Sequence, residues 1–110
     1  MHTMKVKTKY YDLLKSGQKT IELRLFDEKR QKIVVGDEIL FSDASNSNNN
    51  FKAIVVNLYH AESFIKLCEI IAPQKAGFSC KEELKLALEE FYTPAEQEKY
   101  GVVGIEIKKL

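Results

Sequence analysis

The stretch that decides how this chain is interpreted is residues 17–24, GQKTIELR. From position 20 to position 25 polar and apolar residues alternate, which is the pattern of a β-strand with one buried face. The inner face would hold Ile21, Leu23 and Leu25, and the opposite face Thr20, Glu22 and Arg24. Lys19 precedes the strand, so three ionisable groups fall within six positions. Such a face indicates one of two things. It is either a solvated sheet edge, where each ion pair contributes under about 1 kcal/mol to the stability of the fold, or a binding site.

The residues before this stretch predict a strand and a short helix. Polar and apolar residues alternate over part of positions 4–9, MKVKTK, which predicts a short strand. Tyr10, Leu13 and Leu14 then share one helical face. Gly17 stands where helices commonly end in a left-handed residue, so the helix is expected to stop there.

The residues after the stretch predict two more strands. Positions 27–32, DEKRQK, suggest a polar connection, and Gly36-Asp37 suggests a turn before a strand over 38–41. Positions 42–50, SDASNSNNN, predict a mobile loop because nothing in them favours a packed core. A long strand over 51–60 is indicated by its β-branched and aromatic residues.

Three further helices are expected before a final strand. Their predicted spans are 63–71, 79–91 and 93–100. Their capping signals are Ser63, Ser79 with Glu82, and Thr93 with Pro94 and Glu96. Pro73 would end the first helix, and an apolar stripe reaching Phe91 would face the core from the second.

The order of these elements predicts an α+β fold. Strands at both ends of the chain, with helices between them, favour a mainly antiparallel, curved sheet or small β-barrel with three to four helices around it. The last strand, over 102–110, would have to pair with an early one. The length of 110 residues fits one domain over 1–110.

Composition excludes several classes of protein. The chain is 45% hydrophobic and 30% charged, with no apolar run long enough for a membrane helix and no signal-peptide pattern. Cys68 and Cys80 lack zinc or redox spacing, and His2 and His60 are isolated. We therefore expect a cytoplasmic protein, a monomer, with no metal, no cofactor and no membrane partner.

Charge is distributed unevenly along the chain. Residues 1–32 hold nine Lys or Arg against four Asp or Glu, whereas residues 33–110 hold eight against twelve. This asymmetry indicates either a basic face for an anionic partner or two halves that folding intermixes.

The charged residues of the 17–24 stretch form a candidate site. Side chains two apart on a strand face lie about 6.6–7 Å from each other, so Glu22 and Arg24 are neighbours, and Lys19 can reach the same face. The two cations suit a phosphate, and the carboxylate could accept a hydrogen bond from a nucleobase. Alternatively, Glu22 could act as a general acid or base whose pKa Lys19 tunes. Further candidate ligand residues are Tyr10 or Tyr11 for base stacking and Lys29 with Arg30 for phosphate.

Four residues of the stretch, Gly17, Lys19, Glu22 and Arg24, match the pattern GxKxxExR and so resemble the ASCH domain family, a branch of the PUA-like superfamily. Three longer segments resemble small bacterial members of it: MHTMKVKTKYYDLLKSG, DEKRQKIVVGDEILF and EKYGVVGIEI. The resemblance implies a small β-barrel whose pattern residues lie in a cleft beside a helix, and it implies RNA binding.

One branch of that family hydrolyses N4-acetylcytidine with a lysine, a threonine three residues later and a distant glutamate. Lys19 matches the lysine, but Glu22 occupies the threonine position, and Thr20 stands at a different spacing. No residue matches the distant glutamate with confidence, so the resemblance does not carry that activity to this chain.

Three functions remain open on these grounds. The first is an RNA- or nucleotide-binding domain that uses the charged cleft. The second is a hydrolase of an acylated or otherwise modified nucleoside, with Lys19 and Glu22 as catalytic residues; its candidate nucleophiles are Thr20, Cys68, Cys80, His2 and His60. The third is a regulatory domain that contacts a protein partner, which an exposed apolar patch on the helix over 79–91 would favour.

Overall fold

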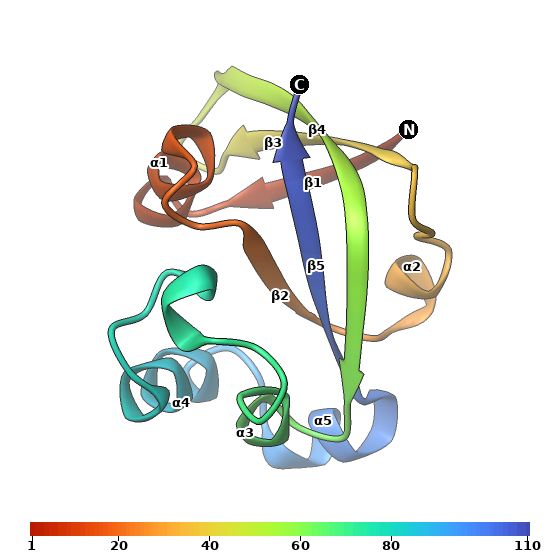
Figure 1. Ribbon diagram of the computed structural model, residues 1–110, viewed down its shortest axis with the longest axis vertical. Coiled ribbons are helices and arrows are strands. Elements are labelled where there is room, and N and C mark those ends of the chain that lie inside the picture. The colour runs from red at the N-terminus through yellow and green to blue at the C-terminus, as the bar shows by residue number, and fades with distance from the viewer.

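The computed structural model describes residues 1–110, and its centre is a curled five-stranded sheet (Figure 1). The strands are β1 (His2–Val6), β2 (Ile21–Leu25), β3 (Glu38–Asp43), β4 (Asn46–Ala61) and β5 (Val102–Lys109). Their order is β1-β3-β4-β5-β2; β1 and β3 are parallel and all other neighbours are antiparallel. The last strand therefore pairs with the early strand β2, as predicted. The sheet is a half-barrel whose two edges are β1 and β2.

Five α-helices and one 3₁₀ helix accompany the sheet, which confirms the α+β class. They are α1 (Thr8–Ser16), α2 (Glu28–Gln31), α3 (Phe64–Leu67), η1 (Pro73–Ala76), α4 (Lys81–Glu89) and α5 (Pro94–Tyr100). Figure 1 shows α3, α4 and α5 grouped at one end of the sheet, with α1 apart from them. None of these helices has the length and hydropathy needed to cross a membrane.

The predicted turn between α1 and β2 is confirmed. Gly17 has a φ of 86°, in the left-handed region that favours glycine, and its N–H donates to the Leu14 carbonyl at 3.2 Å. The predicted inner face of β2 is confirmed as well. Its three apolar residues are buried in one cluster with side chains of α3 and α4.

The segment over residues 42–50 was wrongly predicted to be a mobile loop. It is the end of a hairpin in which Ser42 pairs with Asn50 and Asp43 pairs with Asn46. Asp43 fixes the turn because its carboxylate accepts from the Ser45 N–H at 2.8 Å and from the Thr8 hydroxyl at 2.6 Å. Pairing with β3 supplies the hydrogen-bond partners that this polar segment needs, without a hydrophobic core of its own.

The polar connection predicted over 27–32 contains one helical turn, α2, which the sequence did not predict and which has no buried residue. Asp27 caps this helix by accepting from the Arg30 N–H at 3.1 Å. The single helix predicted over 63–71 is instead one α-helical turn, α3, followed by η1. Ser63 caps α3 as predicted, but Pro73 begins η1 rather than merely ending a helix.

The two remaining capping predictions had different outcomes. Thr93 and Glu96 form a capping box on α5, with reciprocal N–H bonds of 3.0 and 3.1 Å. The predicted box of Ser79 and Glu82 is wrong, since Cys80 is the N-cap of α4 and Glu83 accepts from the Ser79 N–H at 3.0 Å. Glu83 is thereby held on the first turn of α4.

Candidate functional site

Three charged side chains of the GQKTIELR stretch meet on β2. The Lys19 ammonium lies 3.0 Å from Glu22 Oε1. Arg24 Nε donates a hydrogen bond to Glu22 Oε2 at 2.9 Å, and Arg24 Nη2 lies 2.8 Å from the same oxygen as an ion pair. Lys19 is only 4% exposed and Glu22 only 5%. The three side chains are thus a buried ionic triad and not a solvated strand face.

The turn that follows α1 positions Lys19. Its backbone N–H donates to the Leu13 carbonyl at 3.0 Å, and the next N–H, of Thr20, donates to the Lys75 carbonyl at 2.9 Å. Gly77, with a φ of 91°, lies against the Lys19 stem: a Cβ built there would be 3.2 Å from Lys19 Cδ. A glycine at position 77 therefore leaves the space that the buried lysine occupies.

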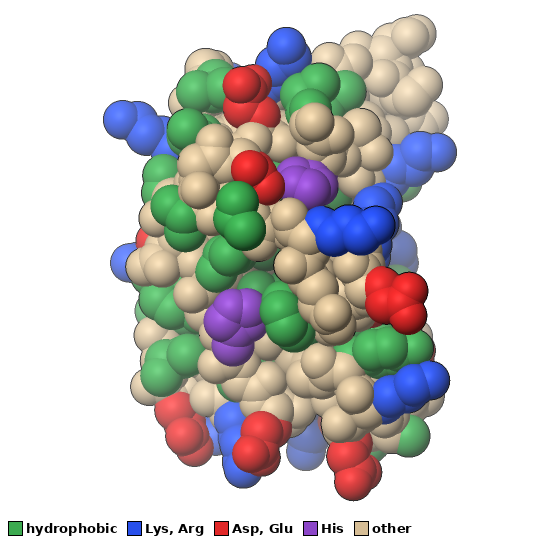
Figure 2. Space-filling view, turned by 90° about the vertical axis from the view of Figure 1, so that its right-hand side faces the viewer, with side chains coloured by type: hydrophobic (Ala, Val, Ile, Leu, Met, Phe, Trp, Pro, Cys, Tyr) green, Lys and Arg blue, Asp and Glu red, His purple; other side chains and the backbone are tan.

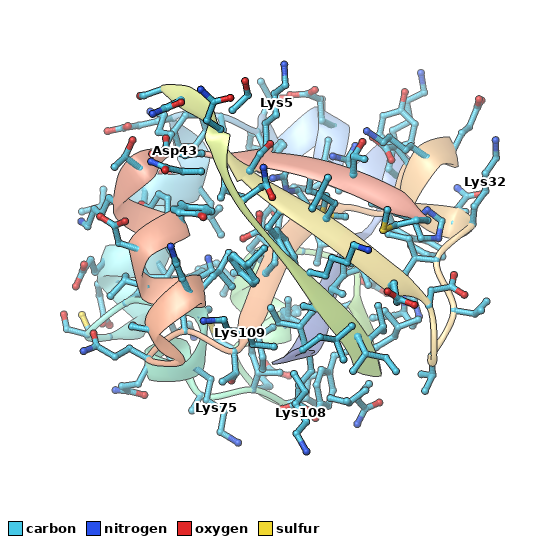
Figure 3. All side chains as sticks on the ribbon, turned by 90° about the horizontal axis from the view of Figure 1, so that it is seen from above. Lys5, Lys32, Asp43, Lys75, Lys108 and Lys109 are labelled. Carbon is cyan, nitrogen blue, oxygen red and sulfur yellow. The ribbon has the colours of Figure 1, made fainter.

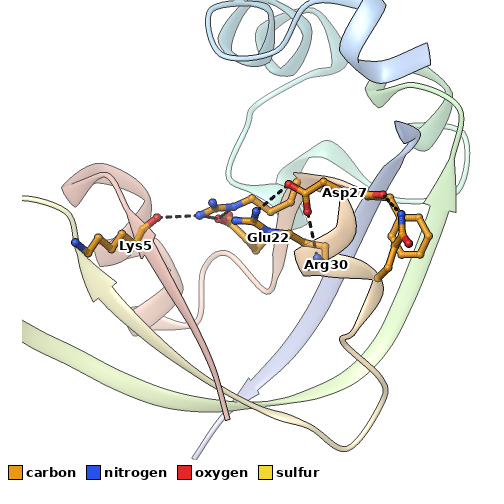
Figure 4. Close-up of polar contacts among 7 residues, drawn as sticks. Lys5, Glu22, Asp27 and Arg30 are labelled. Atoms are coloured by element: carbon orange, nitrogen blue, oxygen red, sulfur yellow. Dashed lines mark hydrogen bonds and ion pairs between the residues drawn. The ribbon is translucent and has the colours of Figure 1, made fainter. Parts of the chain in front are cut away.

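Arg24 makes one further contact, across the opening of the half-barrel. Its Nη2 donates to the Lys5 carbonyl at 2.9 Å (Figure 4). Lys5 belongs to β1 and Arg24 to β2, which are the two edge strands of the sheet. The guanidinium thus connects the two edges while it also binds Glu22.

The triad lies at a cavity of about 180 Å³ between the edges of the sheet and α4. The other residues that line this cavity are Lys5, Val6, Lys7, Tyr10, Leu23, Phe78, Leu88, Phe91 and Tyr92. Four of these side chains are aromatic, so the cavity combines a charged group with flat apolar walls. Concave sites of this composition are the usual form of small-molecule sites.

The aromatic side chains lie close to the cations. The Lys19 ammonium is 4.8 Å from the Tyr10 ring centre, and the Tyr10 and Phe78 rings are 5.7 Å apart. At the mouth, the Lys7 ammonium lies 4.2 Å from the Phe91 ring centre. Rings positioned in this way offer stacking surfaces with positive charge next to them.

The charge state of the triad follows from its geometry. Burial raises the pKa of the Glu22 carboxyl, but the charges and hydrogen bonds of Lys19 and Arg24 outweigh burial and hold that pKa below its usual range. Burial lowers the pKa of Arg24, but Glu22 more than compensates and raises it. Glu22 is therefore a carboxylate at neutral pH, with two positive neighbours.

The two tyrosines of the cavity stay neutral. Burial raises the pKa of Tyr10, and the carboxylates of Glu83 and Glu90 raise it further. Burial also raises the pKa of Tyr92, against the opposing charge of Arg24. Both hydroxyls can therefore donate a hydrogen bond to a ligand at neutral pH.

Two of the predicted ligand residues lie outside this cavity. Lys29 and Arg30 belong to α2, and the Arg30 guanidinium is engaged with Asp27 at 3.1 Å (Figure 4). Tyr11 is also unsuited to stacking with a ligand, because it is buried in the core against Phe51. Of the aromatic and α2 candidates, only Tyr10 lines the cavity.

None of the candidate nucleophiles lines the cavity. Figure 2 shows the two imidazoles apart on one face of the molecule. His2 hydrogen-bonds Asp37 at 2.9 Å, and His60 lies edge-on to the Phe26 ring at 4.6 Å. Cys68 is half-buried and Cys80 is exposed at the start of α4.

Several cavity residues were missed by sequence reasoning. Phe91 was assigned to a core stripe but is 44% exposed at the cavity, and Phe78 and Tyr92 carried no motif. Lys5 and Lys7 were counted only as part of a basic segment. The lysines do not gather into one patch: Figure 3 shows Lys5 well apart from Lys32 and from Lys108.

Comparisons with known proteins find the same fold in solved structures. The hypothetical protein PH0355 is 34% identical, with a TM-score of 0.86 over 98% of this chain and 97% of that one. Protein PF0455 from Pyrococcus furiosus is 31% identical, with a TM-score of 0.74 over 99% and 96%. ASCH from Zymomonas mobilis shares the fold at 11% identity, with a TM-score of 0.66 over 96% of this chain and 65% of that one.

Comparison with curated proteins gives no match. The family model of the ASCH domain matches residues 4–110, which includes every residue of the triad and of the cavity. The chain belongs to the ASCH domain family.

Proposed function

We propose that this protein binds RNA or a nucleotide in the cavity at the ionic triad. The observation that carries the proposal is a buried Lys19–Glu22–Arg24 group beside four aromatic side chains in one small cavity. Aromatic faces stack on any nucleobase, and such stacking contributes about 1–3 kcal/mol per base. ASCH domains are generally associated with RNA binding, which supports the same conclusion.

Glu22 and Lys19 have hydrogen-bonding capacity left for a base edge. An ionised carboxylate has about four acceptor positions, and Lys19 and Arg24 occupy three of them with their contacts to Glu22. The Lys19 ammonium has three N–H donors, and Glu22 is its one ionic partner. A nucleobase edge that presents a donor next to an acceptor complements this pair.

Lys5 and Lys7 would bind the phosphate. Both are exposed and both line the cavity, whereas the predicted phosphate residues Lys29 and Arg30 do not. With two lysines at the mouth, the logarithm of the affinity should fall with the logarithm of salt concentration by a slope of about 0.7–1.4.

Binding has better support than hydrolysis. A general base works best when its pKa lies near the operating pH, and both cations hold the pKa of Glu22 low. None of the candidate nucleophiles Thr20, Cys68, Cys80, His2 and His60 lines the cavity with Glu22. A protein-partner role is favoured only by single exposed residues of the 79–91 segment, Leu86 and Phe91, and Phe91 already belongs to the cavity.

The test is a titration with short mixed-sequence RNA and with the four nucleoside monophosphates, at low and at high salt. We expect Lys7→Ala to weaken binding at low salt and Lys29→Ala, an exposed lysine outside the cavity, to leave it unchanged. Lys19→Ala and Arg24→Ala should abolish binding in variants that retain the native circular dichroism spectrum. Absence of binding at low salt, or equal effects of the two surface substitutions, would contradict the proposal.

A further inference from the structure

We propose that the backbone of Leu23, on the free edge of β2, is a second recognition element of the cavity and binds the edge of an unpaired nucleobase. This inference rests on the proposed function, and it identifies both a specificity-determining residue and the class of RNA that the site accepts. It follows from the hydrogen-bond register of β2, which leaves the N–H and the carbonyl of Leu23 without a partner at the cavity.

The register of β2 decides which of its backbone groups face its one neighbouring strand, β5. In an antiparallel pair, residues that exchange hydrogen bonds with the neighbour alternate with residues whose backbone groups point away from it. The Ile107 N–H donates to the Thr20 carbonyl at 2.9 Å, and the Phe26 N–H donates to the Gly101 carbonyl at 3.0 Å. Positions 20, 22, 24 and 26 therefore face β5, and the backbone groups of positions 21, 23 and 25 point the other way.

Leu23 is the residue of this free edge that lies at the cavity. β2 is an edge strand, so no strand lies on the side to which these backbone groups point. Of the residues at positions 21, 23 and 25, only Leu23 lines the cavity. Its N–H and its carbonyl have no hydrogen-bond partner in the protein, and the residue is only 4% exposed. Because buried backbone groups are nearly always hydrogen-bonded, a ligand in the cavity is the natural partner for both groups.

The opposite side of the cavity presents a further backbone donor, on β1. The Ala44 N–H donates to the Val6 carbonyl at 2.8 Å, so the backbone groups of Val6 point away from the cavity, toward the side of β1 that pairs with β3. The Lys5 carbonyl, which accepts from Arg24, points to the other side. Since the two backbone groups of a strand residue point to the same side, the Lys5 N–H faces the cavity as well. The cavity therefore lies between two strand edges that do not pair with each other.

The buried polar groups of the cavity favour a base edge over a phosphate. The Leu23 carbonyl and the Glu22 carboxylate accept hydrogen bonds, whereas the Leu23 N–H and the Lys19 ammonium donate them. The oxygens of a phosphate are acceptors, so a phosphate would leave both acceptors unsatisfied and would lie beside a negative charge. A nucleobase edge carries donors beside acceptors and can satisfy both kinds of group.

A base can reach these groups only when it is unpaired. Lys19, Glu22 and Leu23 are each at most 5% exposed, so a ligand must insert its edge into the cavity to contact them. In an A-form duplex each base is stacked and paired, and the edges that side chains can reach lie on the shallow minor groove. Such a base cannot enter a buried cavity. The site therefore accepts free nucleotides and single-stranded RNA and excludes duplex RNA.

The first experiment removes the Leu23 N–H alone. Semisynthesis replaces Leu23 by the α-hydroxy acid with the same side chain, which turns the amide into an ester. The same replacement at Leu25 is the matched control, because Leu25 lies on the same free edge but outside the cavity. Both replacements weaken the carbonyl of a preceding residue that faces β5, so their effects on the sheet are alike.

We expect the Leu23 ester to bind the nucleoside monophosphates about three- to tenfold more weakly than the unaltered protein, which is the effect of one lost hydrogen bond. The Leu25 ester should bind them as the unaltered protein does. Urea denaturation of both esters checks that their stabilities match. Equal affinities of the two esters for the monophosphates would overturn the role of Leu23.

The second experiment varies the ligand and uses the unaltered protein. The probes are a single-stranded RNA of about 12 nucleotides, the blunt duplex of the same strand, and ribose 5-phosphate, which has a phosphate and no base. We expect the duplex to bind at least about tenfold more weakly than the single strand, since extracting a paired base costs a few kcal/mol. Ribose 5-phosphate should not displace the single strand. Equal affinity for duplex and single strand, or displacement by ribose 5-phosphate as effective as that by a nucleoside monophosphate, would overturn the inference.

These experiments separate the two proposals. Failure of every RNA and nucleotide probe to bind the unaltered protein would reject the proposed function itself. Binding that depends on Lys7 but is equal for duplex and single strand, or equal for the two esters, would retain the proposed function and reject the inference about Leu23.

Discussion

Arg24 and Lys5 connect the two edge strands of the half-barrel through one hydrogen bond, from the guanidinium Nη2 to a backbone carbonyl at 2.9 Å. The two strands are otherwise separate, since β1 pairs with β3 and β2 pairs with β5. The same guanidinium binds Glu22, so the residue that links the edges also belongs to the ionic triad.

Arg24→Lys should loosen the edge of the sheet. A lysine keeps the charge but lacks the planar fork that binds Glu22 and the Lys5 carbonyl together, so we expect a loss of about 1–3 kcal/mol in the free energy of unfolding. Hydrogen exchange should become faster at the β1 amides. Arg30→Lys is the control, because the Arg30 guanidinium donates to Asp27 and not to the Lys5 carbonyl; equal exchange in β1 for both variants would contradict the role of Arg24.

Gly77→Ala should displace Lys19. A side chain at this positive φ strains the backbone by about 1–2 kcal/mol, and its Cβ would lie 3.2 Å from the Lys19 stem. We therefore expect both lower stability and weaker nucleotide binding. Gly17→Ala is matched in backbone strain, with a φ of 86° and no atom within 4 Å of its added Cβ. It should lower stability alone, and equal losses of binding in the two variants would show that Gly77 does not position Lys19.

Glu22→Gln should destabilise the fold in a pH-dependent way. The variant leaves Lys19 and Arg24 without their buried partner, which costs about 3–5 kcal/mol. Because folding lowers the pKa of Glu22, its stabilisation is complete above the ordinary glutamate pKa of about 4.3 and is lost as the pH falls through the lower folded value.

The measurement for this substitution is urea denaturation of both proteins across the acid range. The difference in unfolding free energy between the unaltered protein and Glu22→Gln should be largest near neutral pH and should shrink below about pH 4. A difference that stays constant with pH would show that the charge of Glu22 does not stabilise the fold.

Tyr10→Ala should weaken ligand binding, since the ring is the stacking surface beside Lys19. Loss of one aromatic face costs about 1–3 kcal/mol per stacked base, which can be measured by calorimetric titration with the nucleoside monophosphates. Tyr10→Phe retains the ring and should bind within a few-fold of the unaltered protein. Equal weakening by both substitutions would assign the effect to the hydroxyl instead.

The elements that could be predicted from the sequence are those specified by residues close to one another along the chain. The alternation of β2, the helix stop at Gly17 and the Thr93–Glu96 cap each depend on residues a few positions apart. The proximity of Lys19, Glu22 and Arg24 could be predicted for the same reason. The burial of these three residues could not be predicted, because the residues that line the cavity with them come from β1, α1, α4 and the segments on both sides of α4.

The incorrect predictions have long-range causes. The Asn-rich segment looked like a loop because its stability comes from β3 and from Asp43 and not from its own composition. The aromatic walls were missed because Phe78, Phe91 and Tyr92 reach the site only through the packing of α4 beside the half-barrel. The apolar stripe of the helix predicted over 79–91 does not show whether Phe91 lies in the core or at the cavity.

Ultraviolet cross-linking of mixed-sequence RNA, followed by mass spectrometry of the cross-linked peptides, tests the central claim most directly. We predict that the base attaches to the aromatic side chains of the triad cavity, which are Tyr10, Phe78, Phe91 and Tyr92, and that excess nucleoside monophosphate prevents the reaction. Cross-links confined to α2 or to the β3–β4 hairpin, with none at those four residues, would show that RNA does not occupy the cavity.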